Sequence, residues 1–292
     1  MGAHVSVAGG LLEGVIHARA AGCEAAQIFP KNPRRWDAPQ RPLAEEQAFR
    51  VGCIEAGVTP VFSHATYLIN PGTADEALWS RSCRALSDEI LRAEGIGASG
   101  LVMHLGTRAS PDTQGCVRRV VETALRGYSI AGTVAVPLLI ENAAGAGSQF
   151  GSRLDEVTSC LLALREAGVP AGICIDTCHA FAAGVDLRGE EGWSTLAAHL
   201  DATCGAGSVA LIHANDSKGC LGCKHDRHEW IGDGQIGEPG FLAMFAAARL
   251  AGAAAIVEMP GDPLVKDSEN VSRLKRLRDG AGGAADPLPS PS

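Results

Sequence analysis

The feature that most constrains the fold is a series of eight short apolar runs spaced along the 292-residue chain. They cover residues 3–7, 25–29, 58–62, 100–103, 134–140, 171–175, 208–212 and 253–257. The runs are nearly continuous rather than alternating, which is typical of strands in a sheet buried on both faces. Each run is therefore predicted to be a strand of one parallel sheet.

Helical patterns fill most of the intervals between these runs. In residues 10–22, for example, Leu11, Val15, Ile16 and Ala20 are expected to share one helix face. The stretches 76–95 and 152–168 show similar patterns and end at Gly, a common residue after a helix C-terminus.

Eight strands that alternate with helices predict a single-domain α/β fold, the (β/α)8 TIM barrel, over residues 1–280. The alternative is a doubly wound open sheet, but no G-x-G-x-x-G motif follows the first run. Residues 281–292 are rich in Gly, Pro and Ser and are predicted to form a disordered tail.

Six successive runs lead into a histidine or a carboxylate, at the strand ends where barrel enzymes place their active sites. These residues are His64, His104, Glu141, Asp176, His213 and Glu258. Their spacings are 40, 37, 35, 37 and 45 residues, about one strand–helix unit each. All six side chains are therefore expected to converge on one mouth of the barrel.

Three further residues extend this set. His179 lies one helical turn beyond Asp176, and Asp226 and His228 are two residues apart in a turn-rich loop, where alternate side chains point the same way. One zinc ion takes about four ligands, so five histidines and four carboxylates predict two or three divalent ions with bridging carboxylates. The share of histidine favours Zn, Mn or Fe over Mg or Ca.

The segment CIDTCHAF allows other interpretations. Asp176 alone could cap a helix, a lone strand-end histidine is more often a hydrogen-bonded core residue, and Cys174 and Cys178 could belong to a cysteine-rich metal knot. The convergence of six strand ends favours an oxygen-and-nitrogen metal site, with the cysteines as packing residues and Cys174 directed into the barrel wall. His4, in the first run, is a candidate for contacting a ligand.

The remaining cysteines carry little information about metal. Cys220 and Cys223 form one C-x-x-C pair without a second pair nearby, which is a weak metal signal. The ten cysteines are spread along the chain, and no apolar run of about 20 residues occurs. These features predict a reduced, cytoplasmic protein without a membrane partner, although organellar and nuclear compartments stay open.

Clustered divalent ions suit phosphoryl chemistry, because they activate water and stabilise charge on phosphate oxygens. Sugar isomerisation or epimerisation on a metal-containing barrel is the alternative, and it often uses a lysine near the metals. No strand ends in lysine here; Lys31 and Lys218 lie just beyond the second and seventh runs. A non-catalytic metal-binding or DNA-binding module is a third possibility, which a nine-ligand set argues against.

Several ordered motifs resemble those of the endonuclease IV family, the zinc-dependent apurinic/apyrimidinic endonucleases. They are GAHVSVAGGL (2–11), FPKNPRRW (29–36), SHATYLIN (63–70), IENAAGAG (140–147), CIDTCHAFAAG (174–184), HANDSKG (213–219), DRHEWIGDG (226–234) and VEMP (257–260). They run through nearly the whole chain. The motif LVMHLG (101–106) departs from the family, which usually has Pro where Leu105 stands.

The resemblance implies three Zn²⁺ ions, with Mn²⁺ as an option at one site. It implies one ion on His64, His104 and Glu141; a second on Glu141, Asp176, His213 and Glu258; and a third on His179, Asp226 and His228. Glu141, Asp176 and Glu258 are the residues expected to serve catalysis. A zinc-bound hydroxide would attack the phosphate 5′ to an abasic site, leaving a 3′-hydroxyl and a 5′-deoxyribose phosphate, with trimming of blocked 3′ ends as a further activity.

The resemblance also implies a partner, double-stranded DNA with abasic sites, and a monomeric enzyme. Lys31, Arg34, Tyr67 and Leu68 are the expected DNA contacts, with Tyr67 and Leu68 filling the space of an extruded nucleotide. The formal net charge of −8 argues against such a partner. Three Zn²⁺ ions would raise it to −2 and concentrate positive charge at the mouth, so local charge is the better guide.

Overall fold

Eight parallel strands close into a barrel in the computed structural model, which describes residues 1–108, 110–247, 250, 252–261 and 263–282. The strands are β1 (Gly2–His4), β2 (Ala25–Ile28), β3 (Val61–His64), β4 (Leu101–His104), β5 (Leu138–Glu141), β6 (Ala171–Asp176), β7 (Val209–His213) and β10 (Ala254–Val257). Their order around the barrel follows the chain, and β1 pairs with β10 to close it. The predicted TIM barrel is confirmed.

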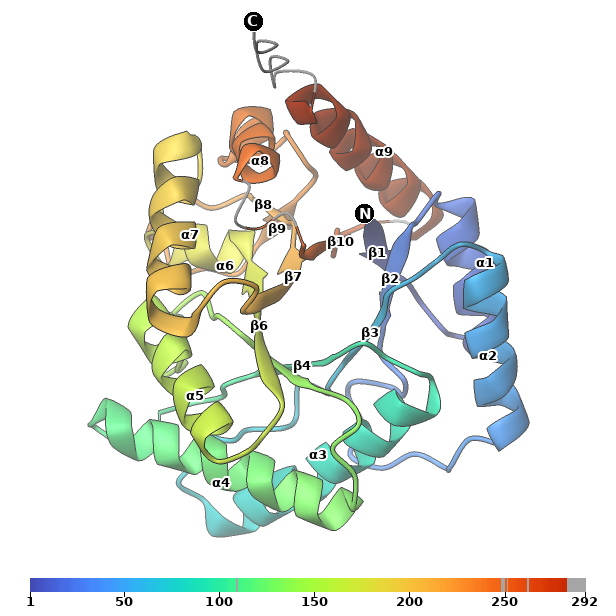
Figure 1. Cartoon of the computed structure of the whole chain (residues 1–292), viewed down its shortest axis with the longest axis vertical. Helices are drawn as coiled ribbons and strands as arrows, with labels where there is room; N and C mark the ends of the chain where they lie inside the picture. Colours follow the sequence, from blue (N-terminus) through green and yellow to red (C-terminus); the bar gives the residue numbers. More distant parts are fainter. Residues whose placement is uncertain (109, 248–249, 251, 262, 283–292) are drawn as a thin grey trace, which may run out of the picture.

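Helices surround the strands on every side in Figure 1. They are α1 (Leu11–Ala20), α2 (Leu43–Glu55), α3 (Glu76–Gly95), α4 (Thr113–Ala131), α5 (Leu154–Glu166), α7 (Glu190–Cys204), α8 (Gly237–Ala246) and α9 (Pro263–Gly282). The short helix α6 (Thr177–Ala182) follows β6 directly, and β8 (Asp216–Ser217) pairs with β9 (His228–Glu229) in a separate antiparallel ribbon.

The ends of β3, β4, β5, β6 and β7 lie one or two residues further along the chain than the apolar runs predict, whereas β1 and β2 end earlier, at His4 and Ile28. His104 and Glu141 are paired residues of β4 and β5, and Asp176 pairs with His213 across β6 and β7. Five of the six predicted strand-end residues are thus the last residues of their strands, and only Glu258 follows its strand. Backbone pairing continues through these polar residues, so apolar character ends before the strand does.

The barrel interior explains why these polar residues converge. One layer of inward side chains is formed by Ala25, Phe62, Val102, Leu139, Cys174, Leu211 and Ile256. Because side chains alternate along a strand, the residues two positions later also point inward. They are Gln27, His64, His104, Glu141, Asp176, His213 and Glu258. Cys174 therefore lies inside the barrel beneath the polar layer, and its predicted placement in the barrel wall is wrong.

One helix face and the predicted start of the tail also differ from the sequence predictions. Helix α1 buries Leu11, Gly14, Val15, His17 and Ala18, whereas Ile16 is 60% exposed and Ala20 is also exposed, so the inward face is rotated relative to the predicted one. Helix α9 continues to Gly282, which makes residues 281–282 helical although they were assigned to the tail. The predicted tail residues 283–292 lie outside the described residues. Among the described residues, no helix has the length and apolar character needed to span a membrane.

Candidate metal centre

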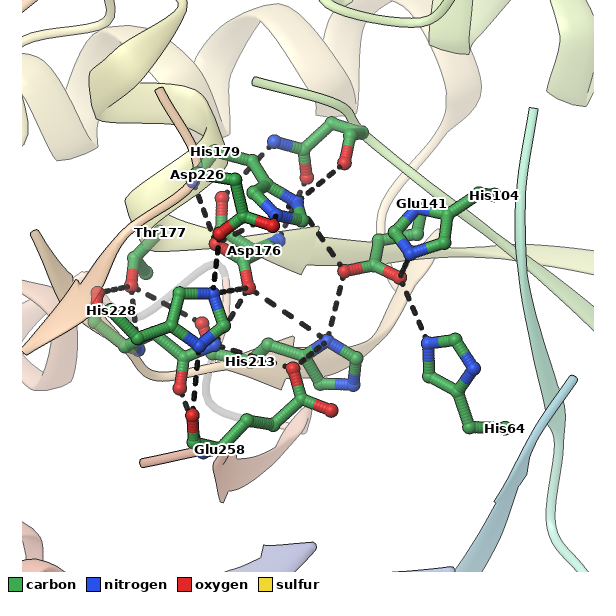
Figure 2. A network of polar contacts seen from close by, with 12 residues as sticks. His64, His104, Glu141, Asp176, Thr177, His179, His213, Asp226, His228 and Glu258 are labelled. Carbon is green, nitrogen blue, oxygen red and sulfur yellow. Dashed lines mark hydrogen bonds and ion pairs between the residues drawn. The ribbon is translucent and has the colours of Figure 1, made fainter. Parts of the chain in front are cut away.

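All nine predicted ligands lie together at the C-terminal mouth of the barrel (Figure 2). They form three groups, and within each group the candidate ligand atoms lie within 4.8 Å of one another. The groups are His64, His104 and Glu141; Glu141, Asp176, His213 and Glu258; and His179, Asp226 and His228. The same three sets are implied by the resemblance to endonuclease IV.

Glu141 lies at the centre of the cluster and is 1% exposed. Its Oε2 is 3.3 Å from Nε2 of His64 and 3.4 Å from Nε2 of His104, while its Oε1 is 3.0 Å from Nδ1 of His213. Burial disfavours its charged form, but the neighbouring histidines His104 and His213 lower the pKa of Glu141 well below its ordinary value. The carboxylate therefore faces two groups at once and is placed to bridge them.

Backbone carbonyls fix the protonation of three histidines. Nδ1 of His64 lies 2.8 Å from the carbonyl oxygen of Ala65. Nδ1 of His179 lies 3.0 Å from the carbonyl oxygen of Asn142, and Nδ1 of His228 lies 2.8 Å from that of Glu258. A carbonyl can only accept a hydrogen bond, so Nδ1 carries a proton, and in the neutral imidazole Nε2 is left with a free lone pair. In each case Nε2 is the nitrogen that faces a carboxylate of the cluster.

His213 differs from these three histidines, because it directs Nδ1 rather than Nε2 toward the cluster. Its Nε2 lies 2.9 Å from Oε1 of Gln27, whose Nε2 donates to Glu258 at 2.8 Å and so fixes the orientation of the amide. Because the amide oxygen accepts from Nε2 of His213, Nδ1 is left to face Glu141. Each of the four imidazoles thus presents one defined ring nitrogen to the cluster, because the other nitrogen is held by a backbone carbonyl or by Gln27.

Asp176 combines two of the roles that the sequence left open. Its Oδ1 accepts a hydrogen bond of 2.7 Å from the backbone N–H of His179 and caps α6. Its Oδ2 accepts from Asn215 at 2.7 Å and lies 3.6 Å from Nε2 of His228. The helix cap therefore orients a carboxylate whose other oxygen faces the cluster.

Three amide side chains that the sequence reasoning missed hold the ligands. Asn142 both donates to and accepts from the backbone of Asp176, and Asn215 accepts the backbone N–H of Glu258 at 2.8 Å. Gln27 is the third. Asn142 follows Glu141 directly, and Asn215 lies two residues after His213. Closeness in sequence to a predicted ligand is therefore the signal that could have identified these two asparagines.

His4 contacts a ligand, as its position in the first strand suggested. Its Nδ1 is 3.0 Å from Oε1 of Glu258 and 2.9 Å from Nε2 of Gln27. Burial lowers the pKa of His4, so its neutral form is favoured. These contacts hold Oε1 of Glu258 and leave Oε2 3.3 Å from Nδ1 of His213.

The third group includes two residues from a loop. Asp226 is half-exposed, with one oxygen 3.2 Å from Nε2 of His179 and the other 3.1 Å from Nε2 of His228. Burial favours the neutral imidazoles, but nearby carboxylates raise the pKa of His179 to about 10 and of His228 to about 9. The loop is supported by the β8–β9 ribbon and by Asp216, whose carboxylate accepts backbone N–H groups from residues 232, 234 and 236.

The donor set fits divalent cations. Four carboxylates and five imidazoles surround one mouth, and both Oε2 of Glu141 and Nε2 of His228 are buried without a hydrogen-bond partner. Carboxylate and imidazole are suitable ligands for Zn²⁺. The Cys178 thiol also lies near Asp176 and His228, but burial raises its pKa to about 12, which disfavours the thiolate form.

Two loops flank the mouth and carry the predicted DNA contacts. Tyr67 is 61% exposed, and its ring centroid lies 5.8 Å from that of His64 and 6.4 Å from that of His104. Leu68 is half-buried and Arg34 is exposed. The Thr66 hydroxyl donates to the carbonyl of Pro33 and joins the two loops.

Lys31 does not fit its predicted role as a DNA contact. It is 5% exposed, and its ammonium donates to the carbonyl of Trp36 at 2.9 Å and to Asp88 at 2.6 Å. The ammonium also lies 3.4 Å from Glu89, which accepts the backbone N–H of Thr66. Lys31 thus supports both rim loops from beneath. Its ammonium is buried and already paired, so it is not available to bind a phosphate.

Comparison with known proteins agrees with the geometry. The family model described as xylose isomerase-like TIM barrel matches residues 15–281. A protein named "Probable endonuclease 4" from Methanoculleus marisnigri is 36% identical over 95% of this chain and 98% of its own length. A protein of the same name from Streptomyces coelicolor is 39% identical over 96% of this chain and 95% of its own. This chain belongs to the endonuclease IV family.

A solved structure of endonuclease IV from Thermus thermophilus aligns with a TM-score of 0.84 at 35% identity, covering 95% of this chain and 98% of that one. An L-ribulose 3-epimerase, at a TM-score of 0.73 and 14% identity, shares the fold alone.

This endonuclease IV sequence has Leu105 where the family usually has proline, and the neighbouring ligand His104 keeps its place. Leu105 is fully buried in the hydrophobic core, and Nε2 of His104 still faces Glu141. The expectation that the histidine keeps its position despite the missing proline is consistent with this geometry.

Proposed function

We propose that this endonuclease IV family member hydrolyses the phosphodiester bond on the 5′ side of abasic sites in double-stranded DNA. The products are a 3′-hydroxyl and a 5′-deoxyribose phosphate, and blocked 3′ ends are also trimmed. The observation that carries the proposal is the set of three ligand groups, two of which share Glu141. Such a cluster suits the transfer of a phosphoryl group.

Three divalent ions are proposed at the three groups, all Zn²⁺ or with Mn²⁺ at one of them. When bound, such ions activate water and stabilise charge on the phosphate and on the leaving oxygen. Glu141 sets the distance between two of the groups, because each of its oxygens faces a different histidine set. Asp176 and Glu258 hold the second group in place, and both are oriented by Asn215.

The rim is proposed to bind the damaged duplex. Tyr67 lies beside the first ligand group and Leu68 follows it in the same loop, so they offer an aromatic and an apolar side chain to fill the space of an extruded nucleotide. Arg34 offers an exposed guanidinium for a phosphate. The enzyme is proposed to act as a monomer.

Sugar isomerisation or epimerisation is the less favoured function. The epimerase structure supports the fold only, and neither of the two lysines just beyond strand ends pairs with a carboxylate of the ligand groups. Lys31 is paired with Asp88, and Lys218 is 71% exposed with Glu229 at 3.7 Å. The relatives at 36% and 39% identity are both named as endonucleases.

The experiment that tests the function uses a labelled duplex with one tetrahydrofuran abasic analogue. This analogue cannot undergo β-elimination, so any cut is hydrolytic. A single cut on the 5′ side, lost on chelation and restored by Zn²⁺, is expected, together with a steep fall in binding as salt increases. An undamaged duplex and a panel of aldoses and ketoses are the controls. Absence of cutting by zinc-loaded protein, or turnover of a sugar instead, would overturn the proposal.

A further inference from the structure

Two of the ten cysteines differ from the rest in their access to solvent. Eight are buried, whereas Cys220 is exposed and Cys223 is half-exposed. Burial raises the pKa of Cys160 and Cys174 to about 12, so these thiols stay protonated as well as inaccessible. A thiol must be accessible to react with a solute, and solvent access singles out Cys220 and Cys223.

A β-turn brings the two exposed cysteines together. The backbone N–H of Cys223 donates to the carbonyl of Cys220 at 3.1 Å, with Leu221 and Gly222 at the two central positions. Gly222 has φ 74°, the left-handed value required at the third position of a type II turn. Such a turn keeps its first and last Cα atoms within about 7 Å, and disulfides span about 4.4–6.8 Å between Cα atoms.

The turn is held in place by the short helix α6. The backbone N–H of Gly222 donates to the carbonyl of Phe181 at 3.0 Å, and that of Lys224 donates to the carbonyl of Ala182 at 2.9 Å. Lys224 itself has φ 57°, an uncommon value for a residue other than Gly. The pair therefore sits in a defined backbone, three residues before Asp226.

A metal knuckle is not supported by the surroundings of this pair. Zinc takes about four ligands. Across the described residues, the groups of three or more potential ligands include neither Cys220 nor Cys223. Two thiols in a turn, without further ligands, are better suited to forming a bond with each other.

We propose that Cys220 and Cys223 form a reversible intrachain disulfide by exchange with a low-molecular-weight disulfide such as oxidised glutathione. The Cys220 thiolate attacks one sulfur of the small disulfide, forms a mixed disulfide and releases one small thiolate. The Cys223 thiolate then attacks Sγ of Cys220, which closes the protein disulfide and releases the second. The two protein thiols lose two protons and two electrons, and the small disulfide is reduced to two thiols.

The test is oxidation of the full zinc-loaded chain with oxidised glutathione, followed by acid quenching, alkylation and mass spectrometry. We expect a loss of about 2 Da that maps to the peptide with Cys220 and Cys223 and is reversed by a dithiol reductant. The readout does not involve DNA, so it is independent of the proposed endonuclease function.

Single variants sharpen the test. C220S and C223S should each stop at a stable adduct with one glutathione, because the resolving thiol is missing. C204S, which alters a buried cysteine, should oxidise like the natural chain. A persistent adduct on the natural chain, no reaction at this pair, or earlier oxidation of the buried cysteines would overturn the proposal.

Discussion

The ligands at the strand ends and the ligands in the loop are positioned in different ways. Glu141 and His213 are 1% and 0% exposed, and both are fixed by the backbone ladder of the barrel. Asp226 comes from a loop and its side chain is 51% exposed. The loop depends on backbone N–H groups that donate to the side-chain carboxylate of Asp216 and on a ribbon of two residues per strand.

This difference indicates a division within the cluster. The first two groups are set by the fold itself and share Glu141, so damage there should affect two ions. The third group shares no ligand with the others among the three described groups. Its ion should therefore be the easier one to remove without loss of the rest.

The largest effect is expected for E141Q. The amide keeps the shape of the side chain but removes the charge that faces both histidine sets, so two groups should lose affinity for metal. A Lewis-acid contribution of several kcal/mol corresponds to a fall in nicking on the order of 10³-fold or more. Metal content and nicking rate would be measured together. Wild-type metal content in this variant would contradict the bridging role.

D226N should separate the third group from the other two. We expect loss of about one ion per chain, retention of the other ions and a fall in nicking on the order of 10²-fold. D233N is the matched control, because Asp233 lies in the same loop region and is 54% exposed, but pairs with Arg273. If D226N lost all its metal, the three groups would not be separable.

Q27L tests the supports beneath the strand-end ligands. It removes the amide that orients both His213 and Glu258, and contacts of this kind are worth about 10–100-fold in metal affinity or activity. Zinc affinity by competition with a chelating dye is the measurement, with the exposed-site variant Q40L as control. An unchanged affinity would show that the barrel alone orients these ligands.

Y67A should leave the cluster intact and weaken the handling of damaged DNA. Loss of the ring is expected to reduce kcat/KM on the abasic duplex about tenfold, because a base–aromatic contact is worth about 1–3 kcal/mol. Y67F keeps the ring and should behave nearly like the natural chain. Reduced zinc content in Y67A would place Tyr67 in the support of the metal centre instead.

The smallest expected effect is on the thermal stability of chelated protein. The raised pKa values of about 10 for His179 and about 9 for His228 lie above the ordinary 6.5. Their charged forms therefore stabilise the chelated protein fully below about pH 6.5, and this stabilisation is lost as the pH rises through 9 to 10. Zinc-loaded protein, with neutral imidazoles throughout, should lack this loss.

Melting temperatures at pH 6.5 and 9.5 would measure this difference. We expect an additional fall on the order of several degrees in the chelated protein, and a smaller fall in chelated H228Q. Equal pH dependence in the chelated and zinc-loaded samples would argue against charged imidazoles in the third group.

The sequence predicted the barrel and its strand-end residues well because both follow from simple periodicities. Glu141 and Asp176 stand at intervals of one strand–helix unit, and the inward direction follows from the alternation of side chains along a strand. Asp226 and His228 were predicted from their two-residue spacing, and the structure brings them to His179.

The remaining features depend on contacts between distant segments. Gln27 and Asn215 hold ligands from other strands through amide groups, which have no pattern of their own in the sequence. Lys31 was assigned to DNA because it lies in the same motif as Arg34. Its position under the rim follows from Asp88 and Glu89 on α3, more than 50 residues away.

The most direct test of the central claim is an anomalous difference map from crystals of the zinc-loaded protein, measured on both sides of the zinc absorption edge. The account predicts three peaks at the barrel mouth: one beside His64, His104 and Glu141; one beside Glu141, Asp176, His213 and Glu258; and one beside His179, Asp226 and His228. Absence of peaks at these groups, or a principal zinc peak at Cys220 and Cys223, would contradict it.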